Sequence, residues 1–207
     1  MVSPVIDLSH HNPDPDWAAV KEAGVVGVIH KATEGTTFRD PELYGRAVGA
    51  TSAGLLWGTY HFMRPGNMRA QMEHYIGVVD PVLGERMALD HEDPRVSLAS
   101  LELAVASLWN LRPDLKVTIY GGNLLKVQLA DRRSETLAET SLWIAQHTRA
   151  VRPSWPRGTW PSWSLWQWTD SEIVPGIPAP VDGDRWNGTS QALEAWLSPG
   201  LDTPLVA

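Results

Sequence analysis

The run Val25-Val26-Gly27-Val28-Ile29-His30-Lys31 is short and largely apolar, as expected of a buried strand. Helical spacing follows over residues 41–53, stops at Gly54, and gives way to a second strand pattern over residues 55–62. Strand, helix and strand in this order predict two parallel strands joined by a right-handed crossover. The alternation continues on both sides. Further strands are predicted at residues 5–8, 86–90 and 116–120, and further helices at residues 14–23, 67–79 and 98–111.

The pattern changes after residue 142. Strand patterns cover residues 142–146 and 164–168, but no helix of normal length fits before a final one at residues 190–197. Pro and Gly, which interrupt regular structure, recur through this part of the chain. They stand at Pro153, Pro156, Gly158, Pro161, Pro175, Gly176, Pro178, Pro180 and Gly183.

Length decides between the two architectures that parallel strands allow. A complete eightfold β/α barrel takes about 250 residues. Eight strands in this chain of 207 residues leave roughly 26 per unit, fewer than the ~30 that a βαβ unit needs. The shortfall coincides with the missing helices, so we expect an α/β fold, an irregular TIM-like β/α barrel with about five β/α units followed by three strands joined by loops. An open doubly wound sheet is less favoured, because no glycine-rich phosphate loop follows the first strand. Residues 1–198 are expected to form a single catalytic domain, followed by a C-terminal tail at 199–207.

Composition argues against several functions. The formal net charge is -7 with no strongly basic stretch, so nucleic acid is not an expected partner. The chain contains no Cys and no H-E-x-x-H or similar spacing, so we expect no thiolate site, no metal and no other cofactor. No run reaches the length of a membrane span, and no signal peptide is recognisable. We expect a monomer that is made in the cytoplasm and does not insert into a membrane.

The strand at residues 86–90 leads into Asp90-His91-Glu92-Asp93. Side chains alternate along a strand, so Asp90 and Glu92 point one way and His91 the other. Two carboxyls this close cannot both ionise easily, so the pKa of one should rise. Enzymes that cleave glycosidic bonds use such a pair, a protonated carboxylic acid beside an ionised carboxylate. Cα atoms two residues apart on a strand are separated by roughly 6.6 Å. This spacing leaves open both a retaining mechanism, with carboxyls about 5–5.5 Å apart, and an inverting one, at about 6.5–9.5 Å.

The chemistry of a β/α barrel lies at the C-terminal ends of its strands. Nearly every predicted strand ends in a polar or aromatic side chain. These are Asp7, Lys31, Glu34, Tyr60, His61, Tyr120, Trp143, Gln146, Gln167 and Asp182. Trp is also frequent, with 11 copies, and eight of them lie from Trp143 onward, where their faces could stack on sugars. One of Trp166 and Trp168, which share a strand face with Gln167 opposite, is expected to face the cleft.

Taken in order, these motifs resemble glycoside hydrolase family 25, the Chalaropsis-type muramidases, across nearly the whole chain. The family fold is a β/α barrel with five β/α units and three further strands, in agreement with the length argument. The resemblance implies a lysozyme that hydrolyses the β-1,4 bond between N-acetylmuramic acid and N-acetylglucosamine, so that peptidoglycan is the expected partner. The matching segments are Ile6-Asp7-Leu8-Ser9, Asp16-Trp17, Lys31-Ala32-Thr33-Glu34-Gly35, Gly58-Thr59-Tyr60-His61-Phe62, Leu89-Asp90-His91-Glu92, Ile119-Tyr120, Leu142-Trp143-Ile144-Ala145, Trp166-Gln167-Trp168, Val181-Asp182 and Trp186-Asn187-Gly188.

The resemblance also implies roles for individual residues. Glu92 is implied as the general acid, and Asp90 as its partner, acting as nucleophile, base or electrostatic stabiliser. Asp7 and Asp182 are implied as further catalytic acids that tune pKa values, position water or hold the substrate. Glu34 could contact substrate or form an ion pair with Lys31. The full set of expected substrate contacts is Glu34, Tyr60, His61, Tyr120, Trp143 and Gln167.

Two positions depart from the family pattern. His91 stands where an apolar residue is common, and we expect it to face a helix outside the lumen. Asp182-Gly183-Asp184 ends in Asp where Asn is often found, which leaves open which carboxyl faces the cleft, with Asp182 favoured.

Two other functions remain possible at this point: a wall-binding module that has lost catalysis, and a metal-dependent hydrolase on the same barrel. The biological role that we expect is phage-mediated lysis, in which the enzyme reaches the bacterial wall after release from the cytoplasm. A bacterial enzyme exported by another route is the alternative.

Overall fold

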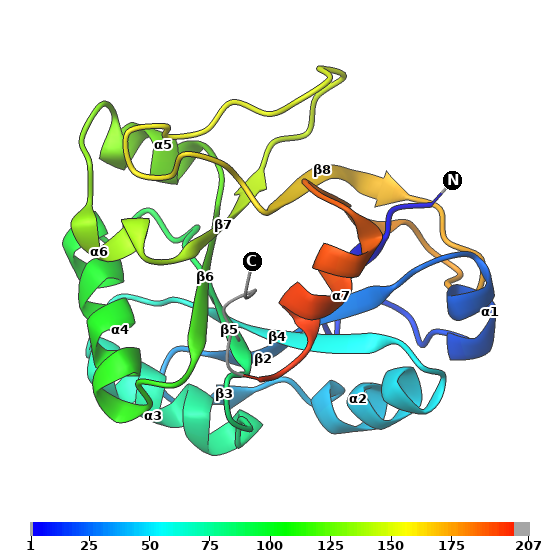
Figure 1. Ribbon diagram of the computed structural model, residues 1–207. Helices are drawn as coiled ribbons and strands as arrows, with labels where there is room; N and C mark the ends of the chain where they lie inside the picture. Colours follow the sequence, from blue (N-terminus) through cyan, green and yellow to red (C-terminus); the bar gives the residue numbers. More distant parts are fainter. Residues whose placement is uncertain (1, 201–207) are drawn as a thin grey trace, which may run out of the picture.

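A computed structural model of the protein describes residues 2–200 and shows a sheet rolled into a barrel, with most helices packed around it (Figure 1). The C-terminal residues 201–207 of the expected tail lie outside the described residues. The strands are β1 (Val5–Leu8), β2 (Gly27–Glu34), β3 (Phe38–Arg39), β4 (Leu56–Phe62), β5 (Arg86–Asp90), β6 (Lys116–Gly121), β7 (Ser141–Ala145), β8 (Leu165–Glu172) and β9 (Val181–Trp186). The helices are α1 (Trp17–Glu22), α2 (Leu43–Ser52), α3 (Met68–Val79), α4 (Leu98–Leu111), α5 (Asn123–Leu129), α6 (Glu135–Ala138) and α7 (Ser190–Leu197).

The barrel closes through β1. The strand order is β1-β9-β8-β7-β6-β5-β4-β2-β3, and a further pairing of β1 with β2 completes the ring, with β3 outside it. β1 runs parallel to β2, with Val5 opposite Gly27, and antiparallel to β9, with Asp7 opposite Asp182. β9 is also antiparallel to β8, so it runs against the other strands of the ring.

This architecture confirms the predicted irregular β/α barrel. Five β/α units run from β1 to α5, and β7, β8 and β9 then follow one another without a helix between them. The bounds of β5, α4 and α7 match the predicted ranges. The sequence pattern did not indicate β3, α5 or α6, because these elements have only two, seven and four residues and show too little periodicity.

Short polar side chains start several helices. The side chains of Asp16, Asn67, Ser97 and Thr189 each accept a hydrogen bond from the backbone N–H three residues later, at the beginning of α1, α3, α4 and α7. Such bonds satisfy amide groups that have no partner within the helix. They fix where each of these helices begins.

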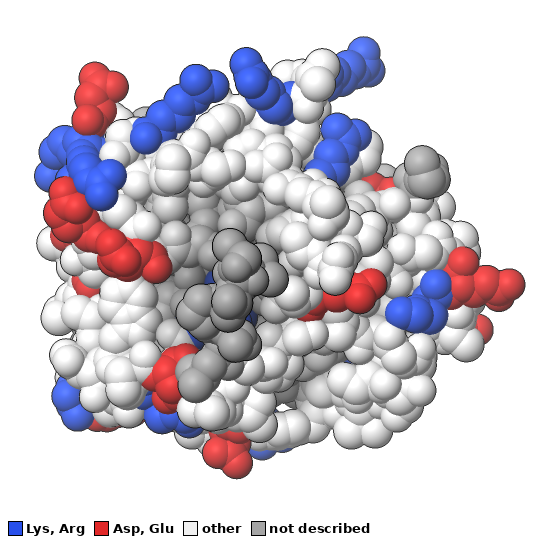
Figure 2. Space-filling model, viewed as in Figure 1, with Lys and Arg blue, Asp and Glu red and all other residues white. Residues whose placement is uncertain are grey.

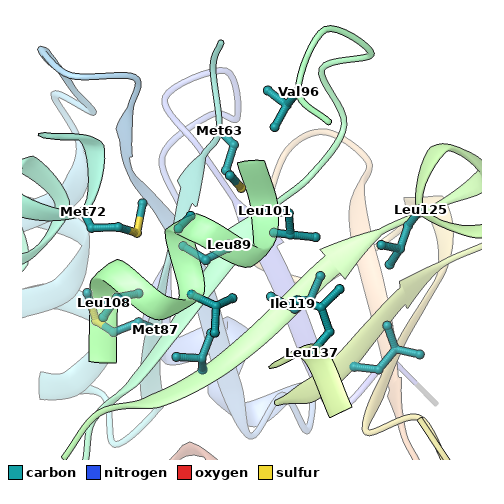
Figure 3. Packing of buried hydrophobic residues seen from close by; sticks show 14 of the residues in the cluster. Met63, Met72, Met87, Leu89, Val96, Leu101, Leu108, Ile119, Leu125 and Leu137 are labelled. Atoms are coloured by element: carbon teal, nitrogen blue, oxygen red, sulfur yellow. The ribbon is translucent and has the colours of Figure 1, made fainter. Parts of the chain in front are cut away.

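Two apolar layers lie on opposite faces of the barrel wall. Outside, α3 and α4 pack on β5 and β6 through Met72, Leu101, Leu89 and Ile119 (Figure 3). Inside, the lumen is filled by residues from several strands and by Leu193 and Leu197 of α7. The strands contribute Val5, Ile29, Ala88, Tyr120, Trp143 and Leu165 to the lumen.

Helix α7 fills the N-terminal end of the barrel. A Cβ atom at Gly27, the first residue of β2, would lie 2.5 Å from Leu197 Cδ1, so the helix side chain packs directly against the backbone of β2 at this Gly. Leu193 and Leu197 thereby fill the lumen at this end. Among residues 2–200, no helix is both long and apolar enough to cross a membrane.

The outer layer predicts a difference between two leucines of α4. Leu101 is fully buried, whereas Leu103 is 57% exposed. We expect Leu101→Ala to lower the free energy of unfolding by about 2–5 kcal/mol, since it removes buried methyl groups and leaves a cavity. Leu103→Ala is the matched control and should change it by less than about 0.5 kcal/mol. Urea unfolding measures both, and equal effects would contradict the packing described.

Candidate active site

A cavity opens at the C-terminal ends of the barrel strands. It draws side chains from β1, β4, β5, β6, β7, β8 and β9, and from the turn after β5. All four acids expected to be catalytic lie in it, together with four of the six residues expected to contact substrate. The lining residues are Asp7, Tyr60, Asp90, Glu92, Tyr120, Trp143, Gln167 and Asp182.

Strand alternation and register bring these residues to one level. On β5, Leu89 packs outward against the helices, so Asp90 faces the lumen. Asp90 is opposite Tyr120 on β6, and Tyr120 is opposite Trp143 on β7. The rings of Tyr120 and Trp143 meet edge to face, with centroids 4.6 Å apart. The cavity wall is therefore aromatic on the side of β6 and β7 and acidic on the side of β5, β9 and β1.

Gln167 connects the two sides. Its Nε2 donates to Asp7 Oδ2 at 2.8 Å, and its Oε1 accepts from the Tyr120 hydroxyl at 2.8 Å. The same Oε1 lies 3.1 Å from His147 Nε2. This amide holds the Asp7 carboxyl and the Tyr120 ring in fixed orientations.

The environment of Asp90 favours retention of a proton, but a nearby cation opposes it. Burial raises the pKa of Asp90, and the negative charge of Glu92 raises it further, while Lys31 lowers it. Asp90 Oδ1 is buried and has no hydrogen-bond partner among residues 2–200. This carboxyl is therefore poorly solvated, and its charge state depends on the neighbouring ions.

Glu92 lies at the exposed mouth of the cavity. Desolvation by the surrounding protein raises the pKa of Glu92, and the negative charge of Asp182 adds to this effect, whereas His147 lowers it. A carboxyl that is accessible to substrate and has a raised pKa stays protonated at higher pH than an ordinary Glu and can serve as a proton donor.

The structure places Asp182 and Asp184 in different environments. Asp182 lines the cavity, as expected, and burial raises its pKa. Asp184 projects from the same face of β9 but lies deeper and is fully buried. Its Oδ1 accepts a hydrogen bond from Trp143 Nε1 at 2.6 Å.

Glu34 forms an ion pair instead of lining the cavity. Lys31 Nζ lies 2.5 Å from Glu34 Oε2, and Arg64 binds both Glu34 and Asp93. Although burial alone would raise the pKa of Glu34, hydrogen bonds from Lys31 and Arg64 lower it overall. The structure therefore contains the ion pair of Glu34 with Lys31, and a substrate contact of Glu34 stays a prediction.

His61 was expected at the cavity and lies on the other face of β4. Adjacent residues of a strand point to opposite faces, and Tyr60 takes the lumen position. The His61 ring is fully buried toward α3, with Nδ1 2.7 Å from Thr33 Oγ1 and Nε2 3.1 Å from Gln71 Oε1. Burial lowers the pKa of His61 to about 4, so the ring is neutral and structural.

The expectation that Trp166 or Trp168 faces the cleft was wrong. Gln167 faces the cavity, so its two neighbours point outward. Trp166 is buried in the outer apolar layer and donates to the backbone oxygen of Gln146 at 2.8 Å. Trp168 donates to Ser3 Oγ at 2.9 Å and is covered by Arg185.

His91 faces outward from the lumen, as predicted. Its Nε2 lies 2.9 Å from Gln128 Oε1 on α5, and the residue is fully buried. It links the turn that carries Glu92 to the neighbouring helix.

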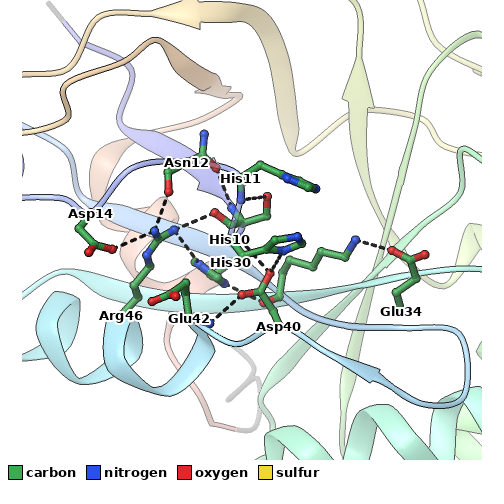
Figure 4. Close-up of polar contacts among 11 residues, drawn as sticks. His10, His11, Asn12, Asp14, His30, Glu34, Asp40, Glu42 and Arg46 are labelled. Carbon is green, nitrogen blue, oxygen red and sulfur yellow. Dashed lines mark hydrogen bonds and ion pairs between the residues drawn. The ribbon is translucent and has the colours of Figure 1, made fainter.

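Sequence reasoning missed a polar network that holds the loop after β1 (Figure 4). Arg46 of α2 is only 5% exposed, and it donates to the backbone oxygens of Ser9 and Asn12, each at 2.7 Å. Beside it, His10 Nδ1 lies 2.8 Å from the buried Asp40 carboxyl. One sequence signal could have indicated that Arg46 is buried. It lies on the same face of α2 as Leu43 and Ala50, which pack against the barrel.

Among the described residues, no group of three or more His, Cys, Asp or Glu side chains is arranged to hold a metal ion.

Comparisons with known proteins converge on one family. The family model described as "Glycosyl hydrolases family 25" matches residues 6–177. The chain is 26% identical over 214 residues to Lysozyme M1 of Streptomyces globisporus, which covers 92% of this chain and 69% of that protein. It is 29% identical over 187 residues to the autolytic lysozyme of Clostridium acetobutylicum, covering 88% of this chain but only 55% of the relative. The crystal structure of the bacterial lysozyme from Streptomyces coelicolor matches with a TM-score of 0.78 at 25% identity, covering 92% of this chain and 94% of that one.

The position of Lys31 predicts how the charge state of Asp90 responds to substitution. Because the ammonium group lowers the pKa of Asp90 against the effects of burial and Glu92, Lys31→Met should raise that pKa. Carbon-detected NMR titration of the carboxyls measures the change. Arg69→Met removes a cation from an exposed pair with Glu73 and serves as the control that should leave Asp90 unchanged. An unchanged Asp90 titration in Lys31→Met would show that the two groups are not coupled.

Proposed function

The chain belongs to family 25 of the glycosyl hydrolases, and on that premise we propose that it is a lysozyme. In this proposal, it is an N-acetylmuramidase that hydrolyses the β-1,4 bond between N-acetylmuramic acid and N-acetylglucosamine in peptidoglycan. The observation that supports it most strongly is the grouping of Asp90 and Glu92 in one cavity with Asp7 and Asp182. The relatives named as lysozymes add independent support.

Position divides the roles of the two central acids, because Glu92 lies at the exposed mouth of the cavity and Asp90 is buried within it. Burial and the charge of Asp182 raise the pKa of Glu92; burial and Glu92 raise the pKa of Asp90, and in the proposed mechanism Lys31 opposes this effect and favours the ionised form that the step needs. Glu92 then donates its proton to the leaving oxygen, and ionised Asp90 faces the positive charge that develops on the sugar. In this role Asp90 acts as nucleophile, base or electrostatic stabiliser.

The other cavity residues support these two acids. Asp182 keeps the pKa of Glu92 raised at the mouth, and Asp7, held by Gln167, presents a carboxyl that can orient water or a sugar hydroxyl. Tyr60, which is only partly buried, can offer its ring and hydroxyl to a saccharide, and the buried Tyr120 and Trp143 form the aromatic wall of the cavity. A sugar bound there is held on one side by rings and on the other by acids.

Positive charge lies beside this rim. Figure 2 shows Lys and Arg gathered along the edge of the molecule at α5 and the loop after β7. That loop, residues 146–164, contains exposed Arg149, Arg152 and Arg157 and no Asp or Glu. Both elements begin at C-terminal ends of strands, next to the cavity. The peptides attached to N-acetylmuramic acid carry carboxylates, so this edge favours approach of a peptidoglycan strand. A role in phage-mediated lysis stays a prediction.

The test is release of reducing ends from purified peptidoglycan. Wild type should release reducing muramic acid ends, and Glu92→Gln, which keeps the size but removes the titrating proton, should lose about 100-fold or more. Glu135→Gln, at an exposed position of α6, is the matched control and should keep full activity. If wild type binds the wall but releases no ends, the chain is a glycan-binding module and the proposal fails.

The pH dependence of activity in the same assay checks the protonation state of Glu92. Its pKa is raised above the ordinary value of 4.5. Activity should therefore fall on the alkaline side only at pH values above the range in which an ordinary Glu titrates. A decline in activity centred near pH 4.5, the ordinary pKa of Glu, would contradict the role of Glu92 as a proton donor whose pKa is raised by its surroundings.

A further inference from the structure

His147 follows β7 at the rim of the barrel and is not among the residues that line the cavity. Its side chain is 43% exposed, so the packing of the core does not require a histidine at this position. The backbone N–H of the preceding residue, Gln146, donates to the backbone oxygen of Gln167 at 3.0 Å and extends the contact between β7 and β8 past the end of β7. The imidazole therefore lies beside the side chains of β8.

One nitrogen of the ring is hydrogen-bonded to a residue of the cavity. His147 Nε2 lies 3.1 Å from Gln167 Oε1, which also accepts from the Tyr120 hydroxyl at 2.8 Å. An amide oxygen has two acceptor sites and no proton to give. Tyr120 and His147 therefore occupy both sites, and His147 Nε2 must carry a hydrogen.

These two donors determine which way the Gln167 amide points. The oxygen and the nitrogen of an amide occupy nearly the same space, so shape alone does not select between its two orientations. Reversal would turn the NH2 group toward the N–H of His147 and the oxygen toward the Asp7 carboxyl, which now accepts from Gln167 Nε2 at 2.8 Å. Burial raises the pKa of Asp7, and the hydrogen bond from Gln167 opposes that rise. The orientation of this amide thus influences the charge of Asp7.

The second nitrogen of the ring faces a carboxylate. His147 Nδ1 lies 3.5 Å from Oδ2 of Asp170, an exposed residue of β8. With the hydrogen on Nε2 committed to Gln167, Nδ1 of a neutral ring would present a lone pair to this oxygen, and the two would repel. Only the imidazolium form, with a hydrogen on both nitrogens, suits Gln167 and Asp170 together.

The other charges around the ring also favour a cation. The acids that interact with it come from three elements: Glu92 after β5, Asp170 on β8 and Asp182 on β9. Burial raises the pKa of Glu92 and that of Asp182, and the charge of His147 lowers both. On the side of α5, the cation Lys126 binds Gln146 and Ser154 of the loop after β7.

We propose that His147 is a positioning residue: its imidazolium donates to Gln167, which holds the Gln167 amide toward Asp7, and it brings a positive charge to the rim that carries Glu92 and Asp182. His147 acts through Gln167 and not on the substrate. The effect on catalysis rests on the proposed lysozyme function, but the hydrogen bond and the charge do not.

Two substitutions separate the donor from the charge. His147→Gln keeps an N–H group at a similar reach but carries no charge, and it should keep kcat within about threefold of wild type in the release of reducing ends. His147→Leu has neither, so kcat should fall on the order of tenfold or more, because Asp7 loses its orientation. KM should change little in both variants, since His147 does not line the cavity. His74→Gln, on α3 outside the barrel, is the matched control and should behave as wild type.

Carbon-detected NMR titration of Glu92 tests the charge without requiring activity. Burial and Asp182 raise the pKa of Glu92, and the cation at position 147 opposes them, so that pKa should rise further in both His147→Gln and His147→Leu. The alkaline decline of activity should move to higher pH in the same two variants. A residue with a purely structural role would move neither, and His74→Gln should leave the titration unchanged.

Each outcome decides the proposal. Full kcat in a folded His147→Leu would overturn the positioning role, and equal losses in His147→Gln and His147→Leu would do the same, because the donor would then not matter. An unchanged Glu92 titration in both variants would show that the ring brings no charge to the rim. Should wild type release no reducing ends, the Glu92 titration still tests the charge. The side-chain amide resonances of Gln167, which should differ between wild type and His147→Leu, still test the hydrogen bond, so the two failures are distinguishable.

Discussion

Closure of the sheet at β1 is the constraint on which the rest of the structure depends. By pairing with β2 on one side and with β9 on the other, β1 turns an open sheet into a ring. In a ring, every second side chain of each strand must enter the lumen, and the C-terminal ends of the parallel strands share one rim. Helix α7 fills the opposite end. The cavity that contains the acids lies at this rim.

The same closure concentrates negative charge where water is scarce. Asp7, Asp90, Asp182 and Asp184 all point inward, and burial raises the pKa of each. The fold offsets this cost with neutral hydrogen-bond donors, Gln167 and Trp143, and with the cations Lys31 and Arg64, which lower the pKa of Asp90. Crowded acids destabilise a fold but give carboxyls with different pKa values, which is what acid-assisted cleavage of a glycosidic bond requires.

Much of the fold follows from sequence patterns, and the failures have physical causes. β5 and α4 could be predicted to the residue because a short apolar run marks the strand and 14 residues of helical spacing mark the helix. The grouping of the four acids in one cavity could be predicted from their places at strand ends, whereas their catalytic roles came only from the family resemblance. His61 was misplaced because being at a strand end does not say which face a residue takes; strict alternation with Tyr60 would have excluded it. The roles of Arg46 and Asp184 depend on partners more than 30 residues away, which no local pattern reveals.

The central claim, that the cavity at the rim of the barrel cleaves a glycan, is tested most directly by a crystal structure of Glu92→Gln with a peptidoglycan tetrasaccharide. Our account predicts that the bond between N-acetylmuramic acid and N-acetylglucosamine lies across the cavity. The glycosidic oxygen should be within about 2.6–3.2 Å of the side chain at position 92, with Asp90 beneath the muramic acid ring. A saccharide bound elsewhere on the molecule, with the ring of acids left empty, would contradict it.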